Sequence, residues 1–386
     1  MIPSPLPPAP GPRRRARRTG ALRIAQVLLL VAAILTTACE RRPSGPSPDE
    51  VRAQIARLLP GYVADRKGWA VDIYAAFAAL DIEPSAQNIC AVLAVTEQES
   101  NFNPHPPVPG LGRIARAEIE RRAQRIHVPA LVVRAALQLE SPDGRTWERR
   151  LAAVRTEKEL SDLYEEMTDT VPLGRRLLAG ANPVRTGGPM QVSIAFAERH
   201  AGAERYPYPV QGSIRHEVFT RRGGMYFGIA HLLDYPAPYD RPLYRFADFN
   251  AGWYASRNAA FQSAVARLAG AALDLDGDLV HHRDRDVVGA TERALRALAP
   301  RLQMTEAEIR DALEISHGPR FERTDLYRRV FELADRKAGR PLPRALVPRI
   351  RLQSPKITRR LTTAWFAERV EGRYRRCMAK ARSGRR

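Results

Sequence analysis

The sequence is poor in cysteine, aromatic residues and long apolar runs. It has three cysteines in 386 residues, which excludes a disulfide-built scaffold and a multi-cysteine zinc or iron–sulfur cluster. No run of eighteen apolar residues occurs, which excludes a multi-span membrane protein. Acidic residues are also scarce, with 42 against 62 lysines and arginines, so the net charge is +20. The 44% apolar content suffices for one large domain, or for one domain with an appendage.

Residues 1–38 have the pattern of a secretory signal peptide. Six arginines precede an apolar run over 24–35, and small residues then lead directly to Cys39. This junction resembles a bacterial lipobox, in which the cysteine becomes the lipidated N-terminus. Ordinary secretion with a coincidental cysteine is the alternative. The segment contains no acidic residue, so its removal lowers the net charge by six.

The resemblance to bacterial lipoproteins predicts a location at the cell envelope. A mature lipoprotein carries three acyl chains, palmitate among them, which is enough for stable anchoring. Glu40 follows the cysteine where an aspartate would favour the inner membrane, so the expected site is the periplasmic face of the outer membrane. Residues 39–50 are rich in proline and serine and are expected to form a short linker.

The rest of the chain has mainly helical patterning, and we expect a mainly α fold. Apolar residues recur at three- and four-residue spacing, while strand signals are few. The expected helices cover 51–59, 69–80, 86–100, 114–126, 129–139, 156–167, 193–200, 214–234, 244–250, 257–272 and 354–379. Capping boxes at Thr156 and Thr305 mark two helix starts.

Glu99 is the first candidate for chemistry. It continues the apolar face of the helix expected over 86–100, whereas Glu97 points elsewhere. A carboxyl at the buried end of a core helix should have a raised pKa, as a general acid requires near neutral pH. The alternative is a structural glutamate that caps a helix or pairs with an arginine.

Four short motifs then occur in a fixed order. They are Glu-Ser-Asn-Phe-Asn-Pro at 99–104, Gly-Pro-Met-Gln-Val at 188–192, Gly-Met-Tyr-Phe at 224–227 and Phe-Asn-Ala-Gly at 249–252. Together they resemble the motifs of soluble-type lytic transglycosylases, which are relatives of goose-type lysozyme. The resemblance covers about 84–270 and implies a lysozyme-like helical core.

That resemblance implies a reaction and a set of site residues. Glu99 would be the single catalytic acid and base, cleaving the bond between N-acetylmuramic acid and N-acetylglucosamine in peptidoglycan. The muramyl 6-hydroxyl attacks C1 and gives a 1,6-anhydro sugar, so no second carboxylate need hold a water. No metal or organic cofactor is required. The substrate-binding residues implied are Ser100, Met190, Gln191, Tyr226, Phe249 and Asn250.

The chain departs from the motif pattern in three places. Phe249 replaces a tyrosine, Pro189 replaces a leucine, and Glu99 lies 92 positions before Gln191. We therefore expect a lysozyme-like domain over 51–290 with a helical insertion at about 105–185, followed by a basic helical extension over 291–386. The whole arrangement resembles the YaiW-like family of proteobacterial lipoproteins. The alternative function is a non-catalytic envelope lipoprotein that binds peptidoglycan or assists another envelope system.

Several further residues allow two interpretations each. Cys90 and Cys377 either form a disulfide in an oxidising compartment or remain separate buried thiols. Trp253 stacks on a sugar or belongs to the core, and Asp248 is either a second cleft carboxylate or a structural one paired with an arginine such as Arg245. The acidic run 274–278 does not fit a calcium loop, because its glycine is misplaced.

The C-terminal tail over 373–386 holds seven basic residues and no acidic one. In the cytosol this would suggest nucleic acid as a partner. Behind a signal peptide the polyanions within reach are membrane lipids and the cell wall, so we expect no nucleic-acid partner. No motif identifies a protein partner.

Overall fold

The computed structural model describes residues 45–170, 182–204, 206–281, 287–352 and 361–384. The predicted signal peptide, the lipidation site Cys39 and the first half of the linker lie outside these ranges, and the last three linker residues begin the first helix. The chain divides into an N-terminal unit, Met1–Glu50, and a compact unit, Val51–Arg386. Helices dominate the described residues, as the sequence predicts. None of the described helices is both long and apolar enough to span a membrane.

The helices before the first strand are α2 (Pro48–Leu58), α3 (Arg66–Ala79), α4 (Ala86–Ser100), α5 (Leu111–Arg125), α6 (Ala130–Leu137), α7 (Trp147–Ala153) and α8 (Glu157–Thr170). A hairpin of β1 (Thr186–Gly187) and β2 (Val192–Ser193) follows. Next come α10 (Ile194–Ala203), α11 (Ile214–Phe219), α12 (Arg221–Leu233), α13 (Pro242–Ala251) and α14 (Ala255–Ala269). The remaining elements are α15 (Ala290–Ala297), α16 (Ala299–Leu302), α17 (Glu306–Glu314), the 3-10 turn η1 (Pro319–Arg323), α18 (Asp325–Ala338), β3 (Arg351–Leu352), β4 (Leu361–Thr362) and α19 (Thr363–Ser383).

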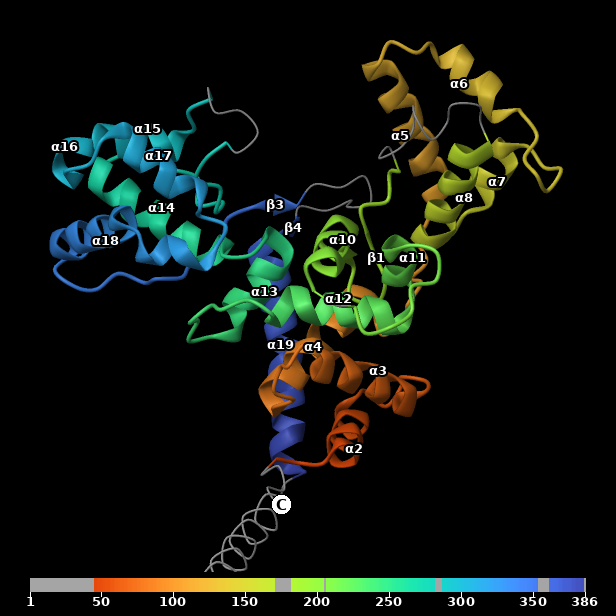
Figure 1. Cartoon of the computed structure of the whole chain (residues 1–386), viewed down its shortest axis with the longest axis horizontal. Coiled ribbons are helices and arrows are strands. Elements are labelled where there is room, and N and C mark those ends of the chain that lie inside the picture. Colours follow the sequence, from red (N-terminus) through yellow and green to blue (C-terminus); the bar gives the residue numbers. More distant parts are fainter. Residues whose placement is uncertain (1–44, 171–181, 205, 282–286, 353–360, 385–386) are drawn as a thin grey trace, which may run out of the picture. The chain divides into compact units, whose positions relative to one another are not determined.

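Helix α4 lies at the centre of the first hydrophobic core. Its residues 89–96 are all buried, and α12 and α19 pack against it. The C-terminal helix α19 packs along α4 and α13, as Figure 1 shows for the dark blue helix. Phe366 and Val370 of α19 belong to the same core as Ile89. The expected extension over 291–386 is therefore corrected, since its last helix is part of the first core.

A disulfide joins the two elements that pack most closely in this core. Cys90 of α4 and Cys377 of α19 are bonded, with their Cα atoms 5.5 Å apart. Of the two interpretations left open by the sequence, the structure shows the disulfide. The bond joins positions separated by 287 residues, and thus connects the helix that carries Glu99 to the end of the chain.

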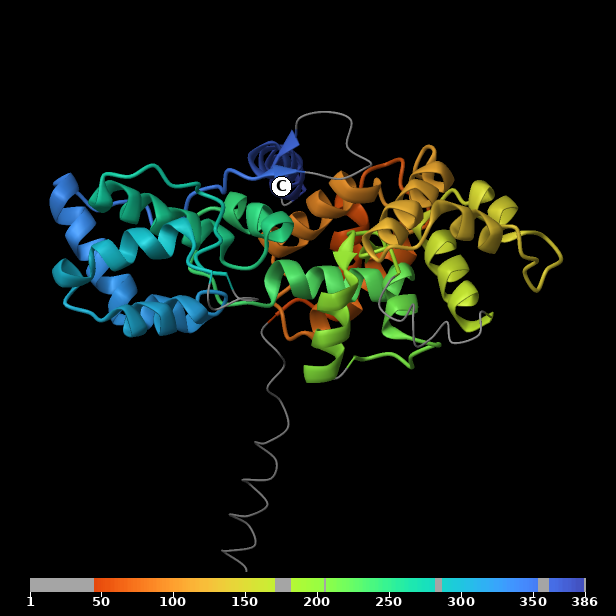
Figure 2. The ribbon, with the colours of Figure 1, turned by 90° about the horizontal axis from the view of Figure 1, so that it is seen from above.

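A second core gathers around α14, drawn in teal in Figure 2 with the bluer helices around it. Phe261 of α14 packs against Phe321 and stacks on Tyr327 of α18, with ring centroids 5.1 and 5.8 Å away. The buried guanidinium of Arg257 donates to the carbonyl oxygens of Ser316 and Gly318. The second core thus begins inside α14, so the boundary expected at 290 does not divide the two cores.

The insertion expected at 105–185 is helical over its described part. Helices α5 to α8 occupy it, and Pro107, ahead of α5, forms an isolated antiparallel bridge with Thr156, ahead of α8. The capping box at Thr156 is confirmed, because its hydroxyl accepts from the Glu159 amide and the Glu159 carboxylate accepts from the Thr156 amide. The described residues of this insertion are thus mainly helical, and their buried side chains continue the first core.

Two helix limits differ from those expected. The helix expected over 214–234 is two helices, because Thr220 is extended (ψ 154°) and its hydroxyl accepts from the Gly223 amide to start α12. The last helix begins at Thr363 instead of 354, with Thr362 as its N-cap. In both cases a threonine is the N-cap of the helix that follows it. The capping hydrogen bond sets where the helix starts, although the apolar periodicity begins earlier in the sequence.

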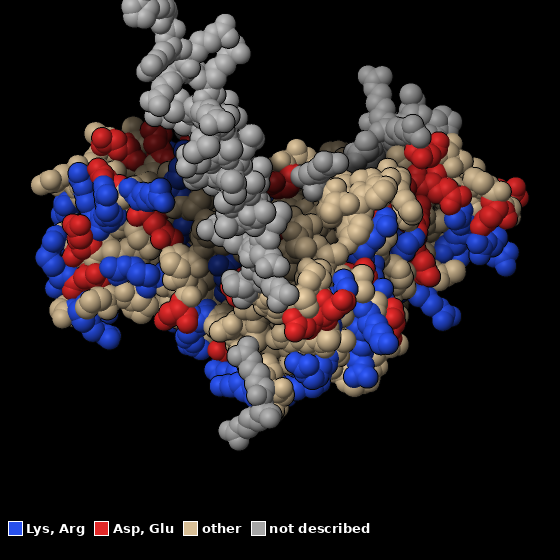
Figure 3. Space-filling view, turned by 60° about the horizontal axis from the view of Figure 1, so that its bottom comes forward, with Lys and Arg blue, Asp and Glu red and all other residues tan. Residues whose placement is uncertain are grey.

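Many surface arginines are bound to acidic neighbours. Arg221, for example, pairs with Asp65 and Asp72 of α3. Figure 3 shows basic and acidic side chains next to one another across the face drawn. The excess of arginine is thus used in part to join helices, and this face has no uniformly basic stripe of the kind typical of nucleic-acid-binding surfaces.

Candidate active site

A cavity of about 1180 Å³ brings together three of the four motif segments. Glu99 comes from the last turn of α4, Gln191 from the β1–β2 hairpin, and Phe249 and Asn250 from α13. The other lining residues are Thr186, Ser193, Phe196, Arg199, His200, Ala203, Glu204, His231, Asp234, Ala251, Gly252, Trp253, Ala255, Gly277, Asp278 and His317. Residues far apart in sequence therefore surround one carboxyl, as the motif order predicts.

Two helix caps place Glu99 at the C-terminal end of α4. Ser85 begins the helix by accepting from the Asn88 amide at 3.2 Å, and Asn101 ends it in the left-handed conformation (φ 50°). The carboxyl therefore lies at the negative end of the helix dipole, which disfavours a further negative charge. It is recessed in the protein and keeps only part of its surface accessible.

Burial raises the pKa of Glu99 to about 8. Among the described residues no hydrogen bond or ion pair reaches its carboxyl, so nothing offsets the loss of hydration. Glu97, two positions earlier, instead lies 3.6 Å from Arg373 and 3.7 Å from Arg376 of α19. The alternative in which Glu99 pairs with an arginine is therefore wrong. It is Glu97 that lies beside arginines. At neutral pH Glu99 is protonated and can donate a proton.

The β1–β2 hairpin holds Gln191 at the cavity. Gln191 has a positive φ of 50°, and its amide nitrogen donates to the Gly188 carbonyl at 3.2 Å. The Thr186 hydroxyl donates to its amide oxygen at 3.4 Å. Gly188 is required at this turn, because its φ is 74° and a Cβ there would lie 2.1 Å from the Val218 carbonyl oxygen. A rigid hairpin thus presents a side-chain amide to the cavity.

The end of α13 supplies a second amide. Asn250 is exposed in the cavity, and its side-chain oxygen accepts from the Thr363 hydroxyl at 3.2 Å. Gly252 ends the helix with φ 108°, a conformation that side chains rarely adopt. Thr363 begins α19, so the C-terminal helix also orients this residue of the site.

Aromatic rings form one wall of the cavity. The Phe196 ring lies 4.7 Å from His231 and 5.4 Å from Trp253, measured between ring centroids. The Trp253 indole nitrogen donates to the His231 carbonyl at 2.7 Å, and Trp253 stacks on Tyr235. The structure thus shows Trp253 in the cavity lining, with part of its surface accessible. The sequence did not identify Phe196 and His231 as site residues, because they lie inside expected helices and belong to no motif.

His231 is neutral at physiological pH. Burial lowers its pKa to about 4. Its Nε2 lies 3.2 Å from the Phe249 carbonyl oxygen, so that nitrogen carries the proton and Nδ1 is left as an acceptor. Phe249 itself brings no hydroxyl to the site, in contrast to the tyrosine of the motif pattern.

Three residues expected to bind substrate lie behind the cavity wall. Ser100 is buried, and its hydroxyl donates to the Thr96 carbonyl. Met190 is fully buried under α12, where a Cβ at Gly228 would lie 2.5 Å from its sulfur. The Tyr226 hydroxyl contacts His200 Nε2 at 3.3 Å, and only His200 reaches the cavity. We correct their role from sugar contact to support of the wall.

Asp248 is structural, as one of its two interpretations proposed, but its partners are not arginines. It is fully buried and accepts from the Tyr235 and Tyr239 hydroxyls at 3.1 and 2.7 Å and from the Ser256 amide at 2.7 Å. Arg245 binds backbone carbonyls instead. The carboxylates that line the cavity besides Glu99 are Glu204, Asp234 and Asp278, and no sequence motif marks them.

The acidic run 274–278 is occupied by hydrogen bonds within the protein. Asp276 accepts from the Gln262 side chain at 2.7 Å and from the Asp278 amide at 2.9 Å. Over the described ranges no group of three or more histidine, cysteine or acidic side chains is arranged to hold a metal ion.

The raised pKa of Glu99 predicts a pH-dependent stability. Because the folded protein keeps the proton from the ordinary pKa of 4.5 up to about 8, its free energy of unfolding should fall as pH rises through that window. The loss should be on the order of 5 kcal/mol. Urea unfolding of Glu99→Gln at several pH values checks this, since the amide removes the titration. An equal slope in both proteins would contradict it.

Comparison with known proteins places the chain among proteins without an assigned activity. A family model described as "Protein of unknown function (DUF1615)" matches residues 62–380. The "Uncharacterized protein YaiW" of Escherichia coli (strain K12) is 50% identical over 351 residues, which are 91% of this chain and 96% of that protein. This bears out the resemblance to YaiW-like proteins. No solved structure matches.

Proposed function

The chain belongs to the DUF1615 family, and we propose that it is a peptidoglycan-cleaving enzyme of the lytic transglycosylase type. One observation carries the proposal. Glu99, which has no partner within the described residues, is a carboxyl with a pKa of about 8 at a cavity that also presents two amides and an aromatic wall. A protonated carboxyl in such a place is suited to general acid catalysis at neutral pH.

The proposed reaction uses Glu99 twice. Its proton goes to the glycosidic oxygen as the bond from C1 of N-acetylmuramic acid breaks. The resulting carboxylate then takes the proton of the muramyl 6-hydroxyl while that oxygen bonds to C1. The product is a 1,6-anhydro sugar, Glu99 is protonated again, and no water is consumed. A single recessed carboxyl suffices for this sequence of steps.

The other cavity residues suit a glycan. Gln191 and Asn250 can exchange hydrogen bonds with hydroxyl and acetamido groups, and both are held in place by hydrogen bonds to the protein. Phe196 and Trp253 give the cavity an apolar, aromatic wall, although the Trp253 ring itself stacks on His231 and Tyr235. The volume of about 1180 Å³ exceeds the roughly 300–1,000 Å³ of pockets for single small ligands, which favours an extended chain.

Digestion of purified sacculi tests the proposal. The protein without its predicted signal peptide, called the secreted chain below, should release muropeptides that are lighter by one water molecule than those made by lysozyme. Reducing-end products would instead show hydrolysis, and would direct attention to Glu204, Asp234 and Asp278. Retention on sacculi without release would favour a peptidoglycan-binding lipoprotein, the alternative that the missing hydroxyl at Phe249 supports.

We propose further that Cys39 anchors the protein to the periplasmic face of the outer membrane. Cys39→Ser should move the protein from the membrane to the soluble periplasmic fraction, because a lipid chain contributes about 0.8 kcal/mol of membrane affinity per buried methylene. Fractionation and mass spectrometry of the mature N-terminus check this. An unmodified, soluble wild-type protein would contradict it.

A further inference from the structure

A second cavity lies in the insertion, away from the residues that surround Glu99. It has a volume of about 720 Å³, and it is lined by residues 107–113 and Arg116 on one side and by Glu148 and residues 151–155 on the other. This size is typical of pockets that bind small molecules or short peptides, for which about 300–1,000 Å³ is usual. The first wall is the start of α5 with the segment before it, and the second is α7 with the segment after it.

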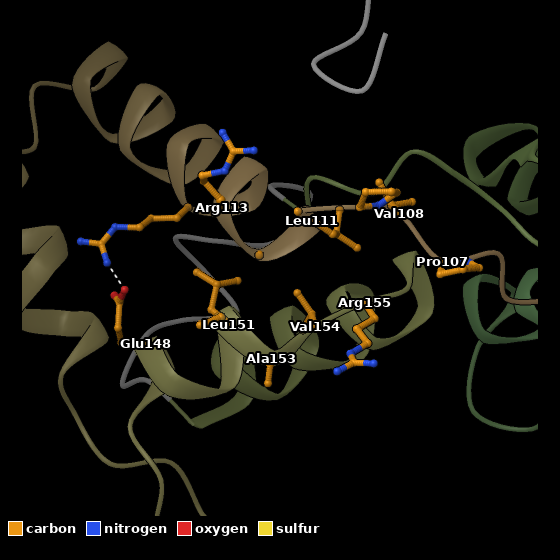
Figure 4. A pocket seen from close by; sticks show the side chains of 14 residues that line it. Pro107, Val108, Leu111, Arg113, Glu148, Leu151, Ala153, Val154 and Arg155 are labelled. Carbon is orange, nitrogen blue, oxygen red and sulfur yellow. Dashed lines mark hydrogen bonds and ion pairs between the residues drawn. The ribbon is translucent and has the colours of Figure 1, made fainter. Parts of the chain in front are cut away.

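The interior of this pocket is apolar. Figure 4 shows Val108 and Leu111 on one side of the space and Leu151 and Val154 on the other. The two walls touch at Gly112, where a Cβ would lie 2.3 Å from the Leu151 carbonyl oxygen. Glycine thus allows α5 to rest directly on α7, and the pocket lies beside this contact.

The rim of the pocket is cationic. Arg113 and Arg155 stand on opposite walls, outside the apolar centre in Figure 4. Both are exposed, and neither guanidinium makes a hydrogen bond or ion pair with the part of the chain that the structure describes. The one carboxylate of the lining, Glu148, is already paired with Arg116. A ligand in this pocket therefore contacts apolar side chains and lies next to the guanidinium groups of Arg113 and Arg155.

We propose that this pocket binds the stem peptide of peptidoglycan, an inference that rests on the proposed function. A stem peptide combines methyl side chains, which fit the floor, with free carboxylates, which match Arg113 and Arg155. A glycan alone fits poorly, since the interior offers few polar groups. The complementarity of charge thus selects a short anionic peptide.

The pocket begins on the segment that follows the helix of Glu99. Pro107 at its edge follows Glu99 by eight residues, which span at most about 29 Å. In peptidoglycan the stem peptide is attached to the muramic acid whose bond Glu99 would break. The proposal thus assigns the glycan to the cavity at Glu99 and a stem peptide of the same strand to the insertion.

Binding of a soluble peptide tests this without any cleavage. Titration calorimetry with synthetic L-Ala-γ-D-Glu-meso-diaminopimelic acid should show saturable binding to the secreted chain and to Glu99→Gln. The double variant Arg113→Ala/Arg155→Ala should bind at least about tenfold more weakly, because two charge-assisted contacts are lost. Ala153→Trp, which fills the pocket from an exposed position, should also abolish binding.

Matched controls separate a specific site from general charge. Arg134→Ala/Arg149→Ala removes two exposed arginines of the same insertion that do not line the pocket, and should bind like wild type. Absence of binding to wild type, or equal loss in both double variants, would overturn the proposal. Peptide binding without any cleavage of sacculi would support the peptide-binding pocket and contradict the proposed function.

Substrate choice gives a second readout. The Arg113→Ala/Arg155→Ala variant should raise KM for intact sacculi while cleaving peptide-free glycan strands like wild type. An unchanged KM for sacculi would contradict a role for the pocket in recognition of the strand.

Discussion

Glu99→Gln is expected to lower the release of anhydromuropeptides by about 10²–10⁴-fold, the usual contribution of a general acid or base. Glutamine keeps the shape of the side chain but carries no transferable proton at either step. Since the Glu99 carboxyl has no partner among the described residues, the amide breaks no contact, and the fold should be retained. Mass spectrometry of sacculus digests measures the loss, and circular dichroism verifies the fold.

Glu97→Gln is the matched control for this variant. It lies in the same turn of α4 and makes the same chemical change, but its carboxyl faces Arg373 and Arg376 at 3.6 and 3.7 Å. Ion pairs of this length and exposure contribute at most about 1 kcal/mol, so activity should persist. Equal activity of Glu99→Gln and wild type would refute the assigned role, and equal loss in both variants would point to damage to α4.

Removal of the disulfide should have the largest effect on stability. Cys90→Ser/Cys377→Ser opens a loop of 287 residues, and the chain-entropy model then predicts a loss of about 5–6 kcal/mol in the free energy of unfolding. Because α19 packs on α4 and its first residue binds Asn250, we expect cleavage activity to fall at elevated temperature as well. Urea unfolding with and without reductant measures the change.

The reductant itself supplies the control for the disulfide prediction. Wild type should lose stability on reduction, while the double serine variant should not respond. A wild-type protein whose unfolding midpoint is the same before and after reduction would show that packing of α19 alone holds the C-terminus in place.

The sequence by itself determined the class of fold and the place of the candidate carboxyl in its helix. Apolar spacing identifies α4, and its end at Ser100 places Glu99 on the buried face. The motif order also singled out Gln191 and Asn250 together with Glu99, and all three line one cavity. Helix periods and caps are local properties, so a single sequence suffices to read them.

Only the tertiary structure decided which side chains reach the cavity. Met190 and Tyr226 share motifs with cavity residues, yet α12 covers the first and His200 lies in front of the second. Glu97 and Glu99 are two residues apart in one helix, and only the approach of α19 gives arginines to one of them.

The same holds for the division into cores and for the disulfide. The basic composition after residue 290 suggested a separate extension, but α19 returns to α4 and completes the site through Thr363 and Asn250. The physical reason is that packing depends on contacts between segments hundreds of residues apart, whereas a sequence pattern records each segment's own faces and not the partner that covers them.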